Sequence, residues 1–131
     1  MEKALQFLKD SGVFYIATID GDQPRVRPFG AACEFEGRLY ITTNNQKPVY
    51  RQIEKNPKVE ISSMTKDGRW IRLSASLVRD DRYEARHAMF EANPSLRRMY
   101  DENDGKFEVL YLKDAEAVIC SFTAAPETFR F

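Results

Sequence analysis

Short β-rich runs separated by turn signals occupy most of the 131-residue chain. These runs are rich in β-branched and aromatic residues, and short turns such as Asp20–Gln23 and Glu36–Arg38 join them. The predicted strands are residues 13–19, 24–36, 38–43, 58–64, 69–80, 107–112 and 115–122. Strands joined by tight turns pair antiparallel, whereas a doubly wound fold needs a helix between successive strands. The pattern therefore predicts a mainly β protein, an antiparallel barrel of six to seven strands with peripheral helices.

Helical patterns occur only between or before groups of strands. They cover residues 2–11, 47–57 and 80–93, with a further short helical turn at 94–100. The tail, residues 123–131, is expected to be ordered because it contains two phenylalanines. No repeat, low-complexity segment or linker interrupts this order. The whole chain, residues 1–131, is therefore predicted to form one domain.

The first three strands are expected to form an antiparallel meander. The second of them contains Pro24 and Pro28, which have no backbone N–H to donate. Proline is tolerated in a strand mainly at a sheet edge or a bend. The second strand is therefore predicted to lie at an edge or to be bent.

Charge and composition exclude several classes of function. Twenty basic residues balance twenty acidic ones, which argues against a nucleic-acid or membrane surface as the main partner. No apolar run approaches the roughly 20 residues of a membrane span, and the charged, amphipathic start does not resemble a secretory signal. One histidine and two distant cysteines give no metal-ligand spacing. We expect a cytoplasmic, metal-free protein whose cysteines pack as small apolar groups.

Cations, hydroxyls and a predicted helix start occur close together in the first half of the chain. Arg27 lies on the second strand, Thr42 and Thr43 end the third, and Lys47 and Pro48 open a helix. A phosphate monoester needs positive charge and directional donors, and a helix N-terminus supplies both. Arginine binds phosphate through two parallel hydrogen bonds, whereas lysine acts as a point charge. These residues predict an anion site at the junction of the third strand and the helix.

The alternative for each of these residues is structural. Arginine and lysine are usually solvated surface charges, and threonine is a common strand residue. His87 lies in the middle of a predicted helix, without an apparent nucleophile or carboxylate partner, and is expected to be an exposed helical residue. Composition alone does not decide between a phosphate site and an ordinary charged surface.

Residues 13–63 resemble the pyridoxamine-phosphate-oxidase-like, FMN-binding split-barrel proteins. The resemblance is carried by a series of short motifs in a fixed order: Y-x-A-T, D-G-x-P-x-x-R-P, L-Y-x-x-T, K, Q-I and N-P-x-V. The similarity continues through residues 67–80 and the final strands. It is greatest to small flavin-nucleotide-binding and nitroimidazole-resistance-like members. The resemblance implies a split barrel that forms a homodimer, with FMN bound in grooves at the interface.

The resemblance also implies a role for individual residues. Arg27 corresponds to the arginine that contacts the FMN phosphate, and Lys47 to the basic residue at the helix start. The other implied cofactor-binding residues are Val26, Pro28, Phe29, Thr42, Thr43, Asn44 and Gln46. Trp70, the only tryptophan, is implied either as a wall of the flavin site of the partner subunit or as a half-buried dimer anchor.

Two departures from the family pattern affect the expected activity. Pyridoxamine-phosphate oxidases proper carry a substrate-binding lysine where this chain has Ala31 or Ala32. Oxidation of pyridoxamine phosphate is therefore not expected. Nitroimidazole-resistance relatives carry a histidine near the flavin, and here only His87 is present. The expected function is an FMN-dependent oxidoreductase of an unidentified small molecule, with NAD(P)H as one candidate electron donor. The alternatives are a non-catalytic flavin-binding or storage module and a split barrel that binds another phosphate-bearing cofactor.

Overall fold

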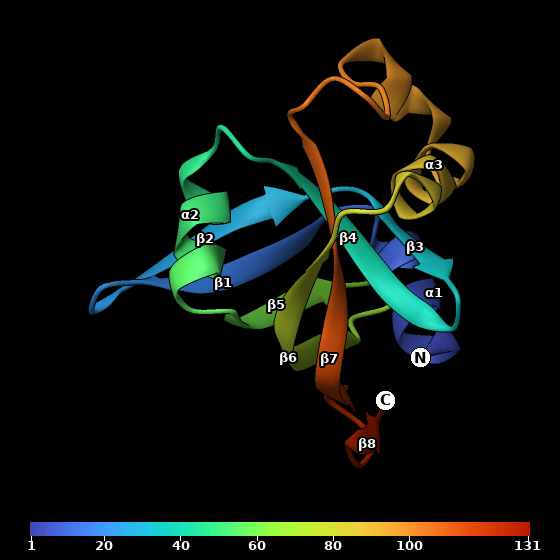
Figure 1. Ribbon diagram of the computed structural model, residues 1–131. Helices are drawn as coiled ribbons and strands as arrows, with labels where there is room; N and C mark the ends of the chain where they lie inside the picture. Colours follow the sequence, from blue (N-terminus) through green and yellow to red (C-terminus); the bar gives the residue numbers. More distant parts are fainter.

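The computed structural model describes all 131 residues as an eight-stranded antiparallel sheet with helices around it (Figure 1). The helices are α1 (Glu2–Ser11), α2 (Pro48–Lys55), α3 (Tyr83–Ala92) and the 3-10 helix η1 (Pro94–Arg98). The strands are β1 (Phe14–Asp20), β2 (Gln23–Phe29), β3 (Ala32–Phe35), β4 (Arg38–Asn44), β5 (Lys58–Met64), β6 (Trp70–Asp80), β7 (Phe107–Cys120) and β8 (Glu127–Arg130). The mainly β, antiparallel fold class is confirmed.

Three differences separate the eight observed strands from the predicted six to seven, of which two add a strand and one removes a strand. The predicted strand 24–36 divides into β2 and β3, because its two halves pair with different neighbours. The two predicted strands 107–112 and 115–122 form the single long strand β7. The tail is ordered as predicted, and it adds β8 by pairing with β7.

The sheet curls almost into a closed barrel. Its strand order is β2-β1-β5-β6-β7-β4-β3, and β8 pairs with β7. The two end strands, β2 and β3, are consecutive in the chain and are joined through Gly30 and Ala31. The ladder between β3 and β4 ends at the pair Ala32–Ile41. The barrel is therefore split between β2 and the last residues of β4. The expected three-stranded meander is present in part: the predicted strand 24–36 pairs with β1 through β2 and with β4 through β3, but no single strand pairs with both neighbours.

Strand β2 is an edge strand, as its two prolines predicted. It pairs with β1 alone, and none of its residues is buried. The other edge of β2 has no partner strand, so the missing N–H groups of Pro24 and Pro28 cost no hydrogen bond there. The free edge of β2 faces the split.

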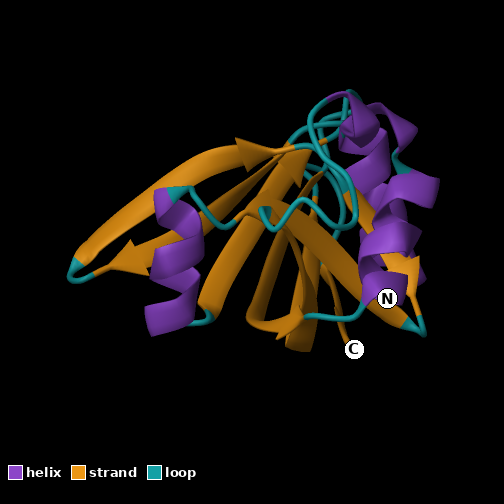
Figure 2. Ribbon diagram, turned by 45° about the horizontal axis from the view of Figure 1, so that its top comes forward, coloured by secondary structure: helices purple, strands orange, loops and turns teal.

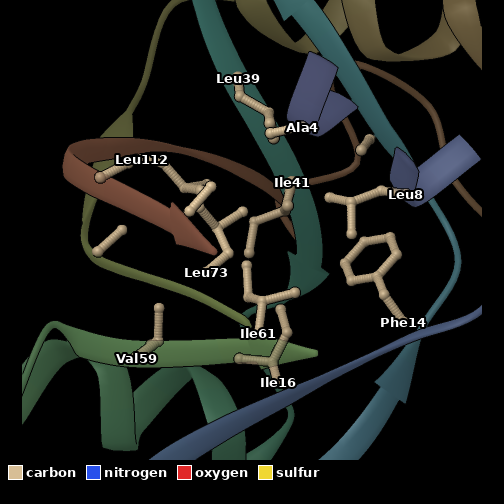
Figure 3. Close-up of a cluster of buried hydrophobic side chains, with 14 of the residues drawn as sticks. Ala4, Leu8, Phe14, Ile16, Leu39, Ile41, Val59, Ile61, Leu73 and Leu112 are labelled. Atoms are coloured by element: carbon tan, nitrogen blue, oxygen red, sulfur yellow. The ribbon is translucent and has the colours of Figure 1, made fainter. Parts of the chain in front are cut away.

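Apolar side chains from both halves of the chain fill the barrel. The alternating strand residues Phe14 and Ile16 of β1, Ile61 of β5 and Leu73 of β6 are almost completely buried and point toward one another (Figure 3). Helix α1 covers one end of this core with Ala4, Leu5, Phe7 and Leu8. A second, smaller core lies beneath α3 and contains Ala85, Met89, Phe90, Phe107 and Val109.

The helices lie on two sides of the sheet (Figure 2). Helix α2 lies against β1, whereas α1 and α3 lie against β3. None of the helices has the length and apolarity that crossing a membrane requires. This arrangement leaves the split between β2 and β4 flanked by α2 and by the α3–η1 segment.

Candidate functional site

A pocket of about 360 Å³ lies at the split of the barrel. Its lining residues come from the end of β2 and the following link, from the end of β4 and the start of α2, and from the segment that follows α3. The third wall is far from the other two in the sequence, and in Figure 1 the end of β2 lies between α2 and the α3–η1 segment. Small-molecule sites typically have volumes of roughly 300–1,000 Å³, so this pocket falls within their range.

Arg27 is the charged residue of the β2 wall. Its Nη1 donates to the backbone oxygen of Ile16 at 3.1 Å and to Oγ1 of Thr18 at 2.8 Å. Its Nη2 donates to Oε1 of Gln52 on α2 at 2.7 Å. All three acceptors are uncharged. Arg27 forms no ion pair, whereas Arg25, Arg79 and Arg82 each pair with a carboxylate. The guanidinium is therefore held in place while its charge has no carboxylate partner.

The surroundings of Arg27 are unfavourable for a cation. Burial, and next repulsion from Arg25, lower the pKa of the Arg27 guanidinium. Arginine nevertheless stays charged in proteins. Arg25 itself is exposed and pairs with Asp20. A half-buried, unneutralised arginine in a pocket wall is the arrangement that an anionic ligand would stabilise.

The β4 wall contains the two predicted threonines and leads to the predicted lysine. Thr43 is buried, and Oγ1 of Thr42 donates to the backbone oxygen of Glu108 at 2.8 Å. Asn44 makes the turn that follows, because its side-chain oxygen accepts from the N–H of Gln46 at 2.8 Å. Lys47 is the N-cap residue of α2 and has extended backbone angles. The turn and the cap direct Lys47 to the same pocket as Arg27 and the threonines.

The third wall was not predicted from the sequence. It consists of Asn93, Ser95, Leu96, Met99 and Tyr100, which follow α3 and include part of η1. The sequence signal for this wall was weak, because Asn93-Pro94 predicted the end of one helix and a short helical turn at 94–100, without any feature that linked the turn to the site. The group of apolar residues after that end was its only further sign.

The predicted site residues fall into three groups. Arg27, Pro28, Phe29, Thr42, Thr43 and Lys47 line the pocket together. Asn44 and Gln46 lie just outside it, in the turn before Lys47, although Nδ2 of Asn44 reaches the hydroxyl of Tyr100 at 3.4 Å. Val26 is 67% exposed on β2 and does not line it. The proximity of the cations and the threonines, on which the predicted anion site depends, is therefore present in the structure.

Trp70 lies outside this pocket. It contributes to a separate apolar groove with Tyr15, Met64 and Phe122. Its ring centroid is 5.0 Å from that of Phe122, which is 83% exposed. We call these four residues the exposed aromatic patch. Trp70 thus contacts no part of the pocket in its own chain.

The pocket lining contains no carboxylate, imidazole or thiol group, because it includes neither aspartate nor glutamate, and neither histidine nor cysteine. His87 does not reach it and has carboxylate partners that the sequence did not reveal. Its Nδ1 lies 2.8 Å from Glu102, and its Nε2 lies 3.4 Å from Glu91. The His87 side chain is 43% exposed, in line with the expected exposed helical residue, but the expected lack of a carboxylate partner was wrong, because Glu102 approaches it from a loop 15 residues further along the chain.

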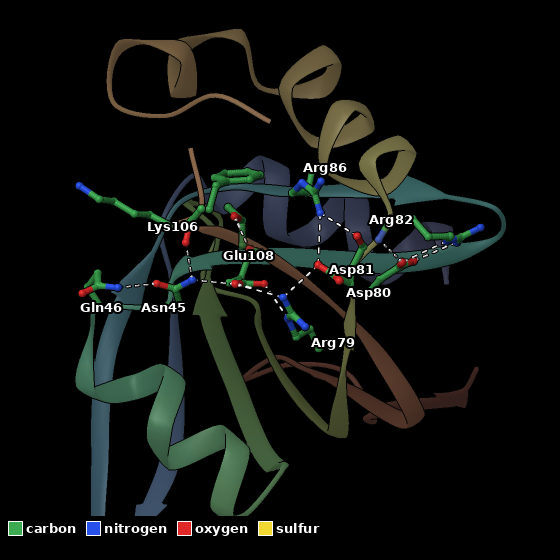
Figure 4. Close-up of polar contacts among 12 residues, drawn as sticks. Asn45, Gln46, Arg79, Asp80, Asp81, Arg82, Arg86, Lys106 and Glu108 are labelled. Atoms are coloured by element: carbon green, nitrogen blue, oxygen red, sulfur yellow. Dashed lines mark hydrogen bonds and ion pairs between the residues drawn. The ribbon is translucent and has the colours of Figure 1, made fainter. Parts of the chain in front are cut away.

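A second polar cluster lies beside the pocket and is internally neutralised (Figure 4). The buried carboxylate of Glu108 accepts from Nε of Arg79 at 2.7 Å and from Nδ2 of Asn45 at 2.8 Å. Arg79 and Arg86 both pair with Asp81. Because each charge has a partner within the chain, this cluster holds β6, β7 and the turn before α2 together. No group of three or more potential metal-binding side chains occurs in the structure.

Residues 1–117 match the model of the family described as pyridoxamine 5'-phosphate oxidase. The chain belongs to the pyridoxamine 5'-phosphate oxidase family. A solved nimC/nimA family protein from Clostridium acetobutylicum is 55% identical, with a TM-score of 0.98, and the match covers 100% of this chain and 92% of that one. No curated protein matches the chain.

Two other solved structures, both under 25% identical, share the fold alone. A pyridoxamine 5'-phosphate oxidase-related, FMN binding protein from Nostoc punctiforme is 14% identical, with a TM-score of 0.63 over 98% of this chain and 90% of that one. A heme binding protein from Mycobacterium smegmatis is 16% identical, with a TM-score of 0.73 over 92% of this chain and 53% of that one. Of these two proteins with the same fold, one is described as FMN binding and the other as heme binding.

Proposed function

We propose that the protein binds FMN in the pocket at the split of the barrel and acts as an FMN-dependent oxidoreductase on a small molecule. One observation carries the proposal most directly. Arg27 is a half-buried cation without a carboxylate partner, and it lines the same pocket as Lys47 and two threonines. Family membership and the FMN-binding relative favour a flavin over other phosphate esters.

The phosphate of FMN fits the charged end of the pocket. A phosphate monoester carries a charge of about −1.5 to −2 at neutral pH, and Arg27 and Lys47 together supply two positive charges. No carboxylate in the lining would compete with the phosphate for them. The guanidinium is already oriented by Thr18 and Gln52, so little side-chain freedom would be lost on binding.

The ring system of FMN fits the rest of the pocket. Phe29, Leu96, Met99 and Tyr100 provide apolar surface there. Beyond Ile41, the edge of β4 that faces the split has no partner strand, and the outer edge of β2 has none either. Unpaired strand edges offer backbone N–H and C=O groups, which match the polar edge of a flavin ring.

When bound, the flavin would supply the redox chemistry, because it exchanges a hydride or single electrons with its reaction partners. The residues of the chain would anchor the phosphate, orient the ring and shield one of its faces. An acid or base from the protein is not required for these tasks. This division of roles agrees with a pocket lined by cations, hydroxyls and apolar groups.

We do not expect oxidation of pyridoxamine phosphate. The residues in the place of the substrate-binding lysine, Ala31 and Ala32, are buried and uncharged. A second phosphate ester would find no cation there. The small-molecule acceptor is therefore expected to be different from a phosphorylated pyridoxamine.

We further propose that the active form is a homodimer. The exposed aromatic patch is a contiguous apolar groove on the outer face of the sheet. Patches of this kind usually mark interaction sites. A second copy of the chain that covers the patch would bury Trp70 and Phe122.

The purified protein tests the cofactor first. Its visible spectrum, with mass spectrometry of the released compound, is expected to identify FMN. The alternative cofactor, haem, would give a different spectrum. Reduction by NAD(P)H or dithionite, followed by acceptor-dependent reoxidation faster than that of free FMN, would support an oxidoreductase. Reoxidation no faster than that of free FMN for every acceptor would instead support a flavin-storage module.

A further inference from the structure

The third wall of the pocket is a weakly held part of the fold. Helix η1 contains no buried residue, and Met99 is 70% exposed. Only the partly buried Leu96 and Tyr100 pack against the second core. From Met99 to Lys106 the chain has no regular secondary structure. Segments with few buried contacts have low local stability, so this wall depends on specific contacts for its position.

Three of the five pocket-lining residues of this segment recur at every third position. These are Leu96 within η1 and the residues that cap η1 at its two ends, Asn93 and Met99. Arg97 lies on a different face and points away, toward the loop before β7. A contact that holds Arg97 therefore fixes the rotation of the turn, and with it the direction of Leu96 and of the cap residues Asn93 and Met99.

Glu102 provides that contact. Its carboxylate oxygens accept from Nη1 and Nη2 of Arg97 at 2.8 and 2.9 Å, a two-armed pair. The same carboxylate lies 2.8 Å from Nδ1 of His87 on α3. The backbone oxygen of Glu102 accepts from Nε of Arg86 at 2.7 Å. The residue thus joins α3, η1 and the loop before β7 through one amino acid.

The two-armed geometry distinguishes this contact from an ordinary surface ion pair, although the Arg97 side chain is 45% exposed. The Glu102 residue is only 8% exposed, although it lies in a loop. Arg97, and next His87, lower the pKa of the Glu102 carboxyl to about 2. Two-armed pairs to a buried carboxylate are both strong and directional. Glu102 does not line the pocket.

We propose that Glu102 is a positioning residue for the flavin-binding pocket. By holding Arg97 it fixes the position of the third wall, and thereby determines the affinity of the pocket for the ring end of the ligand. The proposal rests on the proposed function. It assigns the two ends of the ligand to different parts of the chain. Arg27 and Lys47 act on the phosphate, and Glu102 acts through Asn93, Leu96 and Met99 on the ring.

Comparison of FMN with riboflavin, which lacks the phosphate, separates the two ends. We expect Glu102→Gln to weaken binding of both flavins by the same factor, about 3- to 30-fold, measured by quenching of flavin fluorescence. Hydrogen exchange of residues 94–100 should be faster in this variant. If Glu102→Gln does not fold, Arg97→Gln can take its place, because it leaves the charge of Glu102 and its contact with His87 intact. We expect it to show the same pattern.

Asp80→Asn is the matched control. Asp80 is also a buried carboxylate with arginine contacts, through Oδ1 and Oδ2 to Arg82, but none of its partners lines the pocket. It should lower stability and leave both affinities unchanged. Wild-type affinity for both flavins in Glu102→Gln, unchanged exchange in residues 94–100, or a loss for FMN alone would overturn the positioning role. A wild-type protein that binds neither flavin would instead refute the proposed function.

Discussion

Lys47 offers the cleanest test of the phosphate end of the pocket, because its side chain has no structural partner in the chain. It is exposed, it caps α2 only through its backbone, and it makes no side-chain cap hydrogen bond. The change Lys47→Met removes the charge and keeps most of the apolar stem. The free energy of unfolding should therefore change by about 0.5 kcal/mol or less.

The effect of Lys47→Met on ligand binding should be much larger. A hydrogen bond to a charged group contributes about 1.5–3 kcal/mol. Because Lys47 is exposed, solvent and salt screen its charge, and we expect the lower end, about 1.5 kcal/mol. That energy corresponds to a roughly 12-fold weaker affinity for FMN. Riboflavin has no phosphate, so its affinity should not change.

Titration of flavin fluorescence with wild-type protein, Lys47→Met and Lys55→Met measures these differences. Lys55 is an exposed lysine at the other end of the same helix, and it does not line the pocket. Its variant should bind FMN as the wild type does. Equal losses of FMN affinity in the two variants, or an equal loss for riboflavin in Lys47→Met, would refute a direct contact between Lys47 and the phosphate.

Three further predictions follow from other contacts. Arg27→Ala should weaken FMN binding by about 1.5–3 kcal/mol and also cost about 1 kcal/mol of stability, because Ile16 loses a hydrogen-bond donor; titration and urea unfolding measure the two effects, and unchanged FMN affinity would contradict the assignment. Arg82, and next the hydroxyl of Tyr40, lower the pKa of Asp80 to about 2. The stabilisation by Asp80 is therefore complete above its ordinary pKa of 3.8 and is lost as the pH falls toward 2. Urea midpoints between pH 2 and 5 should fall less steeply in Asp80→Asn than in the wild type, and equal slopes would oppose this reasoning. Phe122→Asp should shift the protein from dimer to monomer in light scattering, and an unaltered dimer would exclude the exposed aromatic patch as its interface.

Much of the fold was predictable because strand and turn signals are local. Pro24 and Pro28 predicted an edge strand, and the structure confirms it. The division of residues 24–36 was not predictable in the same way. Both halves have strand propensity, and only the long-range pairing of β2 with β1 and of β3 with β4 separates them.

The candidate site was predictable to a similar extent. Arg27, Thr42 and Lys47 were identified because cations, hydroxyls and a helix start have a chemical meaning together, and all three line one pocket. The third wall lies some 50 residues away in sequence, and its apolar residues resemble ordinary core positions. Glu102 was missed because its partners, His87 and Arg97, converge on it only after α3 and the loop before β7 have packed. Trp70 was assigned by resemblance, and the role that the resemblance implies requires the proposed second copy of the chain.

The most direct test of the account is a crystal structure of the protein with FMN. We predict that the phosphate contacts the guanidinium of Arg27 and the ammonium of Lys47, with the ring between Phe29 and the wall that contains Leu96. A phosphate bound elsewhere, with Arg27 still held only by Ile16, Thr18 and Gln52, would contradict the central claim.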